Sequence, residues 1–247
     1  MLPARRLAAG KLGRWAMRSL STAAKQAPIA MPSLGQTPKT AEGARELYDK
    51  WAQSYDETLR SWDYPAPAQA AQLLNLHLVP GGTSGPVLDA GCGTGLSGEA
   101  LHAQGFTRLV GIDVSEASLK LCKTKGIYEQ LEICDLDCSA GPLQFEDNSF
   151  SGVVSVGVFS YVHNFERLFK ELCRITAPGG VVVFTHRHPL WGEDVDGVRS
   201  AAAALEANTE APRWVQLLVS EPQDYMPCNP DPAESSKKIN YIVHRVL

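Results

Sequence analysis

The stretch that most constrains the fold is VLDAGCGTG at residues 87–95, where four residues typical of a buried strand run directly into three glycines. Gly91, Gly93 and Gly95 alternate with other residues within a single turn of the chain. Glycine loses more conformational entropy on folding than any other residue, so such a cluster indicates that a ligand approaches the backbone closely. A strand, a glycine turn and a helix in this order predict an open α/β sheet that binds its ligand beyond the carboxyl ends of its strands.

Segments typical of strands and helices alternate through the rest of the chain. The strand-like runs are continuously apolar, which favours a parallel sheet covered by helices on both faces. The last two runs have no crossover helix between them and are expected to pair antiparallel, and the loop at 227–238 shows no helical pattern. The predicted strands are 86–90, 109–113, 131–135, 150–158, 181–186, 213–221 and 239–247, and the predicted helices are 41–62, 96–106, 115–126 and 165–175.

The first forty residues differ in composition from the remainder. Residues 1–40 carry seven of the 23 basic residues and none of the 27 acidic ones, and they are rich in Ala, Arg and Ser. This composition is typical of a transit peptide and predicts a mitochondrial or plastid location; the alternative is a disordered basic tail on a cytoplasmic protein. We expect residues 1–40 to form this segment and its linker, and 41–247 to form one domain whose first helix (41–65) is a cap.

The composition of residues 41–247 argues against several classes of partner. With 16 basic against 27 acidic residues, this part lacks the excess of cations that nucleic-acid binding requires. No apolar run approaches the roughly 20 residues of a membrane-spanning helix. Cys134 and Cys138 have no second pair of cysteines nearby, and His186-Arg187-His188 has no third ligand, so no metal site is expected.

Two classes of ligand compete for the glycine turn. Gly93, Gly95 and Gly98 match the G-x-G-x-x-G spacing of dinucleotide-binding proteins, which keeps an NAD-dependent oxidoreductase as an alternative. Asp113, twenty residues after Gly93, fits that pattern as well. In this register, however, the first glycine lies four residues beyond Asp89 at the end of the strand, which makes the turn too long to cradle a pyrophosphate.

Three aspartates favour a cationic nucleoside instead. Asp89, Asp113 and Asp135 end the first three predicted strands and are expected to meet at one edge of the sheet. Asp113 is placed to accept two ribose hydroxyls, and Asp135 to accept from an adenine amino group, with the backbone N–H of Leu136 near a ring nitrogen. Asp89 repels a pyrophosphate but tolerates an ammonium or a sulfonium. Each aspartate alone is equally well explained as a solvated or capping carboxylate.

Several blocks together resemble the class I S-adenosylmethionine-dependent methyltransferases over residues 44–247. Further blocks at 47–59, 186–191 and 219–230 resemble the methyltransferase-like protein 27 branch of that family. The family blocks are VLDAGCGTG, GIDVS at 111–115, ICDLD at 133–137, LQFEDNSFSGVVSVGV at 143–158 and LFKELCRITAPGGVVVF at 168–184.

The resemblance implies a three-layer α/β/α Rossmann-like fold, with a seven-stranded, mostly parallel sheet in the order 3-2-1-4-5-7-6 whose last strand is antiparallel. It also implies S-adenosyl-L-methionine as the cofactor and methyl transfer as the reaction. A catalytically idle cofactor-binding protein remains an alternative. The predicted cofactor-binding residues are Tyr55, Asp89, Gly91, Cys92, Gly93, Asp113, Val114, Asp135, Leu136 and Val156.

The acceptor is expected to be a small molecule that binds after the fourth and fifth strands. Methyl transfer from a sulfonium needs alignment and exclusion of water, and it needs a base only when the acceptor must lose a proton. No catalytic residue is therefore assigned, although His163 is a candidate general base whose alternative is an exposed or capping histidine. The predicted acceptor-side residues are Trp62, Tyr161, His163, His186 and Trp191.

Overall fold

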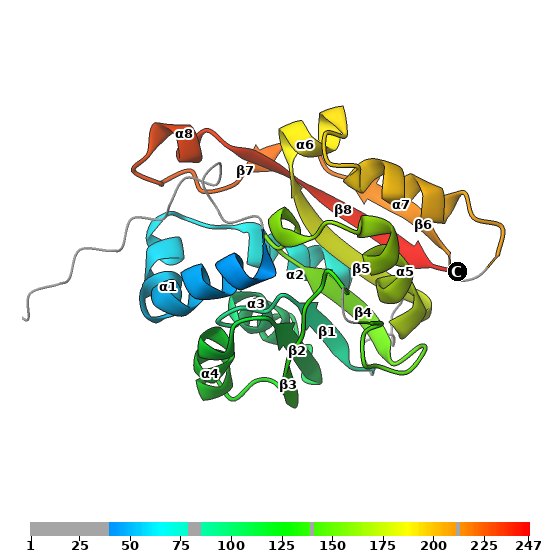
Figure 1. The fold of residues 1–247 in the computed structure, drawn as a ribbon, viewed down its shortest axis with the longest axis horizontal. Coiled ribbons are helices and arrows are strands. Elements are labelled where there is room, and N and C mark those ends of the chain that lie inside the picture. The colour runs from blue at the N-terminus through cyan, green and yellow to red at the C-terminus, as the bar shows by residue number, and fades with distance from the viewer. Residues whose placement is uncertain (1–39, 79–84, 139–140, 211–212) are drawn as a thin grey trace, which may run out of the picture.

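The computed structural model describes residues 40–78, 85–138, 141–210 and 213–247 (Figure 1). The helices in these ranges are α1 (Ala41–Ser61), α2 (Ala66–His77), α3 (Leu96–Ala103), α4 (Glu116–Thr124), α5 (Phe165–Ile175), α6 (His188–Glu193), α7 (Val198–Glu206), α8 (Pro232–Ser235) and the 3-10 helix η2 (Phe159–Tyr161). The strands are β1 (Val87–Ala90), β2 (Leu109–Asp113), β3 (Gln130–Ile133), β4 (Phe150–Ser155), β5 (Thr176–Arg187), β6 (Trp214–Val219), β7 (Gln223–Asp224) and β8 (Lys238–Val246).

The strands form one mixed sheet in the order β3-β2-β1-β4-β5-β8-β6. The first five strands pair parallel, whereas β8 runs antiparallel between β5 and β6. This arrangement confirms the predicted order 3-2-1-4-5-7-6, in which β8 is the antiparallel strand. The two-residue β7, which pairs with the start of β8, was not predicted.

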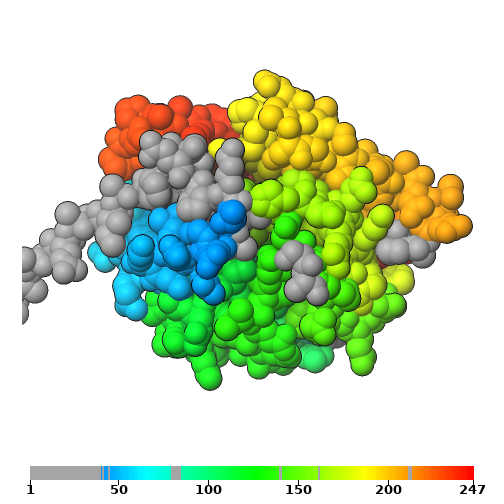
Figure 2. Space-filling model, in the orientation of Figure 1, coloured from blue at the N-terminus to red at the C-terminus, as the bar shows by residue number. Residues whose placement is uncertain are grey.

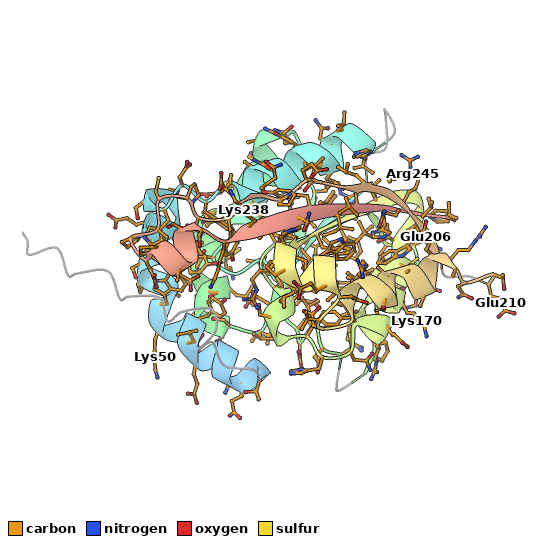
Figure 3. The ribbon with its side chains drawn as sticks, turned by 90° about the horizontal axis from the view of Figure 1, so that it is seen from above. Lys50, Lys170, Glu206, Glu210, Lys238 and Arg245 are labelled. Atoms are coloured by element: carbon orange, nitrogen blue, oxygen red, sulfur yellow. The ribbon has the colours of Figure 1, made fainter. Side chains whose placement is uncertain are left out.

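Helices cover both faces of the sheet. On one face α5, η2, α6 and α7 form a core with alternate residues of β1, β2, β4, β5 and β8, in which Phe169 of α5 lies 5.3 Å from Phe184 of β5 between ring centroids. On the other face α2 and α3 pack on the remaining alternate residues. Seen from above, β8 runs between these two helical layers, with Lys238 and Arg245 near its opposite ends (Figure 3). Arg245 Nη2 donates to the carbonyl of His77 at 2.9 Å, which ties β8 to the end of α2.

Helix α1 lies across the carboxyl ends of the strands, next to α4 (Figures 1 and 2). It begins after Thr40, whose hydroxyl caps it by accepting from the N–H of Gly43 at 3.2 Å. Trp51 and Leu59 are buried together with Trp62 and Met226, so the aromatic stripe of α1 is partly core. The predicted cap helix is therefore present, and it ends four residues before the predicted boundary at 65.

Several elements differ from the prediction for local reasons. Helix α2 was missed because most of its own residues are small or apolar. Its sequence therefore shows little contrast between an apolar and a polar face. Strand β4 ends at Ser155 rather than at 158, and Gly157 then turns the chain with a φ of 74°. Strand β3 ends at Ile133, two residues before Asp135. Helices α6 and α7 were also missed, and the loop predicted to lack a helix contains the short α8.

Candidate active site

A cleft lies at the carboxyl ends of β1, β2 and β4, beneath α1. Its empty volume is about 730 Å³, including the solvent at its mouth. It contains eight of the ten predicted cofactor-binding residues. The residues that line it are Tyr48, Tyr55, Gly91, Gly93, Thr94, Asp113, Val114, Ser118, Cys134, Asp135, Leu136, Asp137, Val156, Gly157, Val158 and Val162.

Asp113 ends β2 with its carboxylate held by the backbone on both sides. Oδ2 accepts from the N–H of Gly93 at 2.8 Å, and Oδ1 accepts from the N–H of Ser115 at 2.9 Å. Burial raises the pKa of this carboxyl, and the hydrogen bonds from Ser115, Gly93 and Val114 oppose that rise. A carboxylate has lone pairs beyond the two used here, so Asp113 is oriented to accept from further donors in the cleft, as a ribose would supply.

Two glycines of this region have different surroundings, and each has a structural reason. Gly93 has a φ of 51°, and a side chain added there would meet no atom within 4 Å, so its backbone is an open cradle facing the cleft. Gly98 lies inside α3. A Cβ at Gly98 would come within 2.0 Å of Tyr128 Oη, so this glycine makes room for a tyrosine.

Asp89 has a different role from the one predicted for it. It is fully buried and is not among the residues that line the cleft. Oδ2 accepts from the hydroxyl of Tyr128 at 2.6 Å, and burial raises the pKa of the carboxyl to about 7. Asp89 pairs with Gly111 and therefore shares a face of the sheet with Asp113, but it lies two residues deeper in the sheet, against the backbone of Gly98 in α3. Asp89 therefore supports the glycine turn from behind.

The far end of the cleft is mostly apolar. Val114, Leu136, Val158 and Val162 line it together with Asp135, whose Oδ1 accepts from the N–H of Asp137 at 2.9 Å. Apolar walls beside a carboxylate acceptor suit a flat heterocycle that carries an amino group. Cys92 does not line the cleft, because its side chain packs on Leu119 and Cys122 of α4.

Comparisons with known proteins agree with this geometry. Residues 88–184 match the family model described as "Methyltransferase domain". The chain is 31% identical over 201 residues to human methyltransferase-like protein 27. The matched region covers 79% of this chain and 80% of that protein. It is also 30% identical to demethylmenaquinone methyltransferase of Tropheryma whipplei, over 75% of this chain and 74% of that protein. The chain belongs to the class I S-adenosylmethionine-dependent methyltransferases.

A solved structure shows the same fold. Geranyl diphosphate C-methyltransferase from Streptomyces coelicolor, in complex with Mg²⁺, geranyl diphosphate and S-adenosyl-L-homocysteine, superposes with a TM-score of 0.52 at 16% identity. The match covers 72% of this chain and 76% of that one. The cofactor of the methyltransferase described here is S-adenosylmethionine, and the open backbone at Gly93 and the oriented carboxylate of Asp113 fit it.

Polar contacts fasten α1 over the cofactor cleft of the methyltransferase. Asp56 accepts from the Thr94 hydroxyl in the glycine turn and from Lys125 Nζ at 2.7 Å. One turn later, Arg60 Nη2 lies 3.0 Å from Glu99 Oε2 of α3. Toward the start of the helix, Asp49 Oδ1 accepts from the Ser115 hydroxyl at 2.5 Å. We call the Asp56, Thr94 and Lys125 contacts the α1 latch. It places Tyr48 and Tyr55 over the cleft.

A second cavity adjoins the cofactor cleft. The two share Tyr48, Tyr55 and Gly157, and the second has an empty volume of about 610 Å³, including open solvent. It lies where β5 ends, between α1 and residues 225–226. Its other lining residues are Leu59, Phe159, Ser160, Thr185, His186, Arg187, Tyr225, Met226 and Ile239.

His186 is the predicted acceptor-side residue that the structure brings to the second cavity. Its Nε2 lies 3.0 Å from Asp196 Oδ2, and its side chain is buried. Burial lowers the pKa of the imidazole, while Asp196 opposes this change. The histidine is therefore neutral near pH 7 and oriented by a carboxylate.

The other predicted acceptor-side residues lie elsewhere or are not described. Trp62 packs on Trp51 beneath α1, and Trp191 is buried against Phe184, so neither lines a cavity. The side chain of His163 is 59% exposed and lies outside both cavities, with Nδ1 3.6 Å from Asp137 Oδ2, which agrees with its alternative interpretation as an exposed histidine. The side chain of Tyr161 lies outside what the structure describes.

Several lining residues were missed, and some had a usable signal. Tyr48 lies seven residues before Tyr55, two helical turns along the same face of α1, so the periodicity of that helix places both over the cleft. Thr185 and Arg187 follow from alternation at the end of β5, once its end is known. Tyr225 and Met226 carried no local signal, because they reach the site only through the pairing of β7 with β8.

Other features of the described residues bear on function. Helices that are both long and apolar enough to cross a membrane are absent from the described ranges. Within those same ranges, no three His, Cys, Asp or Glu side chains gather to hold a metal ion. All six cysteines are free thiols.

Proposed function

We propose that the enzyme methylates a small-molecule acceptor held in the second cavity. The observation that carries this proposal is the wall of Tyr48, Tyr55 and Gly157 common to both cavities. A methyl group held beside these shared residues would reach an acceptor in the second cavity without crossing bulk solvent. The lining of the second cavity combines aromatic side chains with a few polar ones, as small-molecule sites do.

The residues of the chain contribute position and exclusion of water. When bound, S-adenosylmethionine would supply an electrophilic methyl group: the acceptor would attack the methyl carbon in line, and the C–S bond would break to release S-adenosylhomocysteine as a neutral thioether. Asp113 and Gly93 orient the nucleoside side of the cleft, and Tyr55 on α1 covers it. Holding two reactants in register removes most of the entropic cost of their encounter, so methyl transfer needs little more from the protein.

His186 is the residue that can take a proton from the acceptor. Its imidazole lines the second cavity and is neutral near pH 7, because burial lowers its pKa. With Nε2–H donated to Asp196, the lone pair resides on Nδ1. An acceptor hydroxyl or ammonium in this cavity would lose its proton to Nδ1, whereas a carbon nucleophile that is already electron-rich would not require it.

The proposal is tested by following an isotopically labelled methyl group from S-adenosylmethionine into a cell extract. The extract is separated into fractions below and above about 1 kDa, a boundary that drug-sized ligands fall below. Each fraction is incubated with the enzyme. Mass spectrometry should find the label in compounds of the small fraction. Label confined to the protein or nucleic-acid fraction would contradict the proposal. Asp113→Ala serves as the control for transfer that depends on the cofactor site.

We also propose that residues 1–40 direct the protein to a mitochondrion or plastid. The support is the composition of this segment, with seven basic residues and no acidic ones. A fusion of residues 1–40 to a fluorescent protein should enter the organelle, and a variant with its arginines replaced by glutamine should not. A diffuse cytoplasmic signal from the unmodified fusion would favour the alternative of a basic tail.

A further inference from the structure

The second cavity contains an unneutralised positive charge. Arg187 lines it, and its guanidinium forms no hydrogen bond or ion pair with any residue that the structure describes. No described residue in the lining of this cavity is acidic. Asp196, which lies beside His186 of this lining, is paired with that histidine. The electrostatic field in the cavity therefore attracts anions, although the domain as a whole is acidic.

The fold holds the backbone of Arg187 firmly. Arg187 is the last residue of β5 and pairs with Ile239 of β8. The next residue, His188, begins α6, and its Nδ1 lies 3.0 Å from Asn240 Oδ1. On the same face of β5, two residues earlier, the Thr185 hydroxyl accepts from the N–H of Gly157 at 2.9 Å. Arg187 therefore lies two residues along β5 from Thr185, whose hydrogen bond to Gly157 helps to form the wall between the two cavities.

An unpaired, half-buried guanidinium among aromatic side chains is costly unless a ligand satisfies it. Its planar group of N–H donors matches a carboxylate bidentately, and hydrogen bonds to charged groups are the strong ones in partly desolvated sites. The lining also includes Phe159, Tyr225 and Met226, which supply apolar surface in the same cavity next to the hydroxyls of Ser160 and Thr185. The site is therefore built for an anion attached to an apolar body.

We propose that the acceptor is a small carboxylic acid with an apolar, aromatic-sized body, anchored through its carboxylate by Arg187. This inference rests on the proposed function, since it names the class of molecule that occupies the second cavity. A carboxylate is favoured over a phosphate because Arg187 is the one cation in the described lining, and a single guanidinium balances one negative charge but not two.

The test is a titration of the protein saturated with S-adenosylhomocysteine. The probes are benzoate, its neutral analogue benzamide, and phenyl phosphate, each followed by calorimetry and by the side-chain Nε–H signals of arginine. Benzoate should bind at least about tenfold more tightly than benzamide, as expected for a hydrogen bond to a charged partner. It should also shift the Nε–H signal that is missing from the spectrum of Arg187→Gln.

Arg187→Gln should reduce benzoate affinity to the level of benzamide, and Arg187→Lys should retain part of it. The matched control is Arg213→Gln, which removes the same charge from the exposed residue before β6. Since β6 runs parallel to β5, this residue lies at the opposite edge of the sheet. All three variants should bind S-adenosylhomocysteine like the wild type, which shows that they are folded.

Equal binding of benzoate and benzamide, no saturable response to benzoate, or an undiminished response in Arg187→Gln would overturn the assignment. Tighter binding of phenyl phosphate than of benzoate would overturn the choice of a carboxylate. These titrations do not depend on turnover. If benzoate binds as expected but the labelling experiment fails, only the proposed function is contradicted. If benzoate does not bind but neutral small molecules become labelled, only this inference is contradicted.

Discussion

The two cavities of this enzyme are neighbours, yet they are built in different ways. The cofactor cleft is formed by consecutive strand ends and the turns after them, and backbone groups hold its key side chain, as at Gly93, Asp113 and Ser115. The second cavity is assembled from α1, the end of β5, residues 225–226 and the start of β8. A local motif therefore specifies the first, whereas only the complete topology specifies the second. This difference explains how relatives can share a cofactor and differ in their acceptors.

The largest effect is expected on the cofactor side. Asp113→Ala removes the carboxylate that the structure aims into the cleft, and it leaves the N–H groups of Gly93 and Ser115 without their acceptor. The affinity for S-adenosylhomocysteine should fall by about 1.5–3 kcal/mol, or roughly 10- to 150-fold, as for the loss of a charged hydrogen bond. Calorimetry measures this, and benzoate binding should change far less. An unaltered affinity for S-adenosylhomocysteine would mean that Asp113 does not hold the cofactor, and it would contradict this account of the cofactor cleft.

A second effect concerns stability on the acceptor side of the sheet. His244 of β8 is buried between Trp214 and Phe184, at ring-centroid distances of 4.2 and 5.7 Å, and neither of its ring nitrogens has a hydrogen-bond partner among the residues that the structure describes. Burial lowers the pKa of this imidazole to about 3. The unfolded chain takes up the proton near pH 6.5, so the stability that the neutral ring contributes is full above that pH and is lost as the pH falls toward 3.

His244→Phe should therefore be more stable than the wild type at pH 5 by about 2 kcal/mol, from 1.36 kcal/mol for each pH unit below 6.5. Denaturant unfolding at pH 5 and pH 8 measures the change, with the exposed His102→Phe as the matched control. Cofactor affinity should not respond, because His244 lies in the core behind β5. A pH slope that is identical in the wild type and in His244→Phe would refute this account of the residue.

The next largest effect is expected from a substitution at Gly157, in the wall between the cavities. Gly157 has a φ of 74°, and a Cβ there would lie 3.0 Å from Tyr64 Oη. Gly157→Ala should cost about 1–2 kcal/mol of stability from the left-handed conformation. It should also slow methyl transfer in a single-turnover assay more than it weakens cofactor binding. Gly179→Ala is the control, because its φ is 82° in open space. If both variants slow transfer equally, the wall has no special role.

The smallest effect is expected at the α1 latch. Lys125→Met removes the ion pair to Asp56, in which both side chains are only partly exposed. Exposed pairs contribute up to about 1 kcal/mol, so S-adenosylhomocysteine should dissociate several-fold faster at low salt. The difference should shrink in 1 M salt, where such pairs are screened. Stopped-flow measurements compare it with Lys123→Met on the exposed side of α4. A rate increase that is independent of salt would point to lost packing instead.

The same contrast describes what the sequence could predict. The order of the sheet and the roles of Asp113 and Gly93 follow from residues close together in the chain, where a strand, a turn and a helix fix one another's geometry. Asp89 was misplaced because it lies beside Gly111, two residues deeper in the sheet than Asp113, and the motif alone does not report this depth. Arg187 and Tyr225 were missed because an antiparallel return strand brings them together across 38 residues of sequence.

The most direct test of the central claim is a crystal structure of the enzyme with S-adenosylmethionine. The account predicts that Asp113 accepts from both ribose hydroxyls, and that the sulfonium methyl group points at the wall between Tyr55 and Gly157, toward Thr185 and Arg187. A methyl group directed into solvent, or a nucleoside that avoids Asp113, would contradict it.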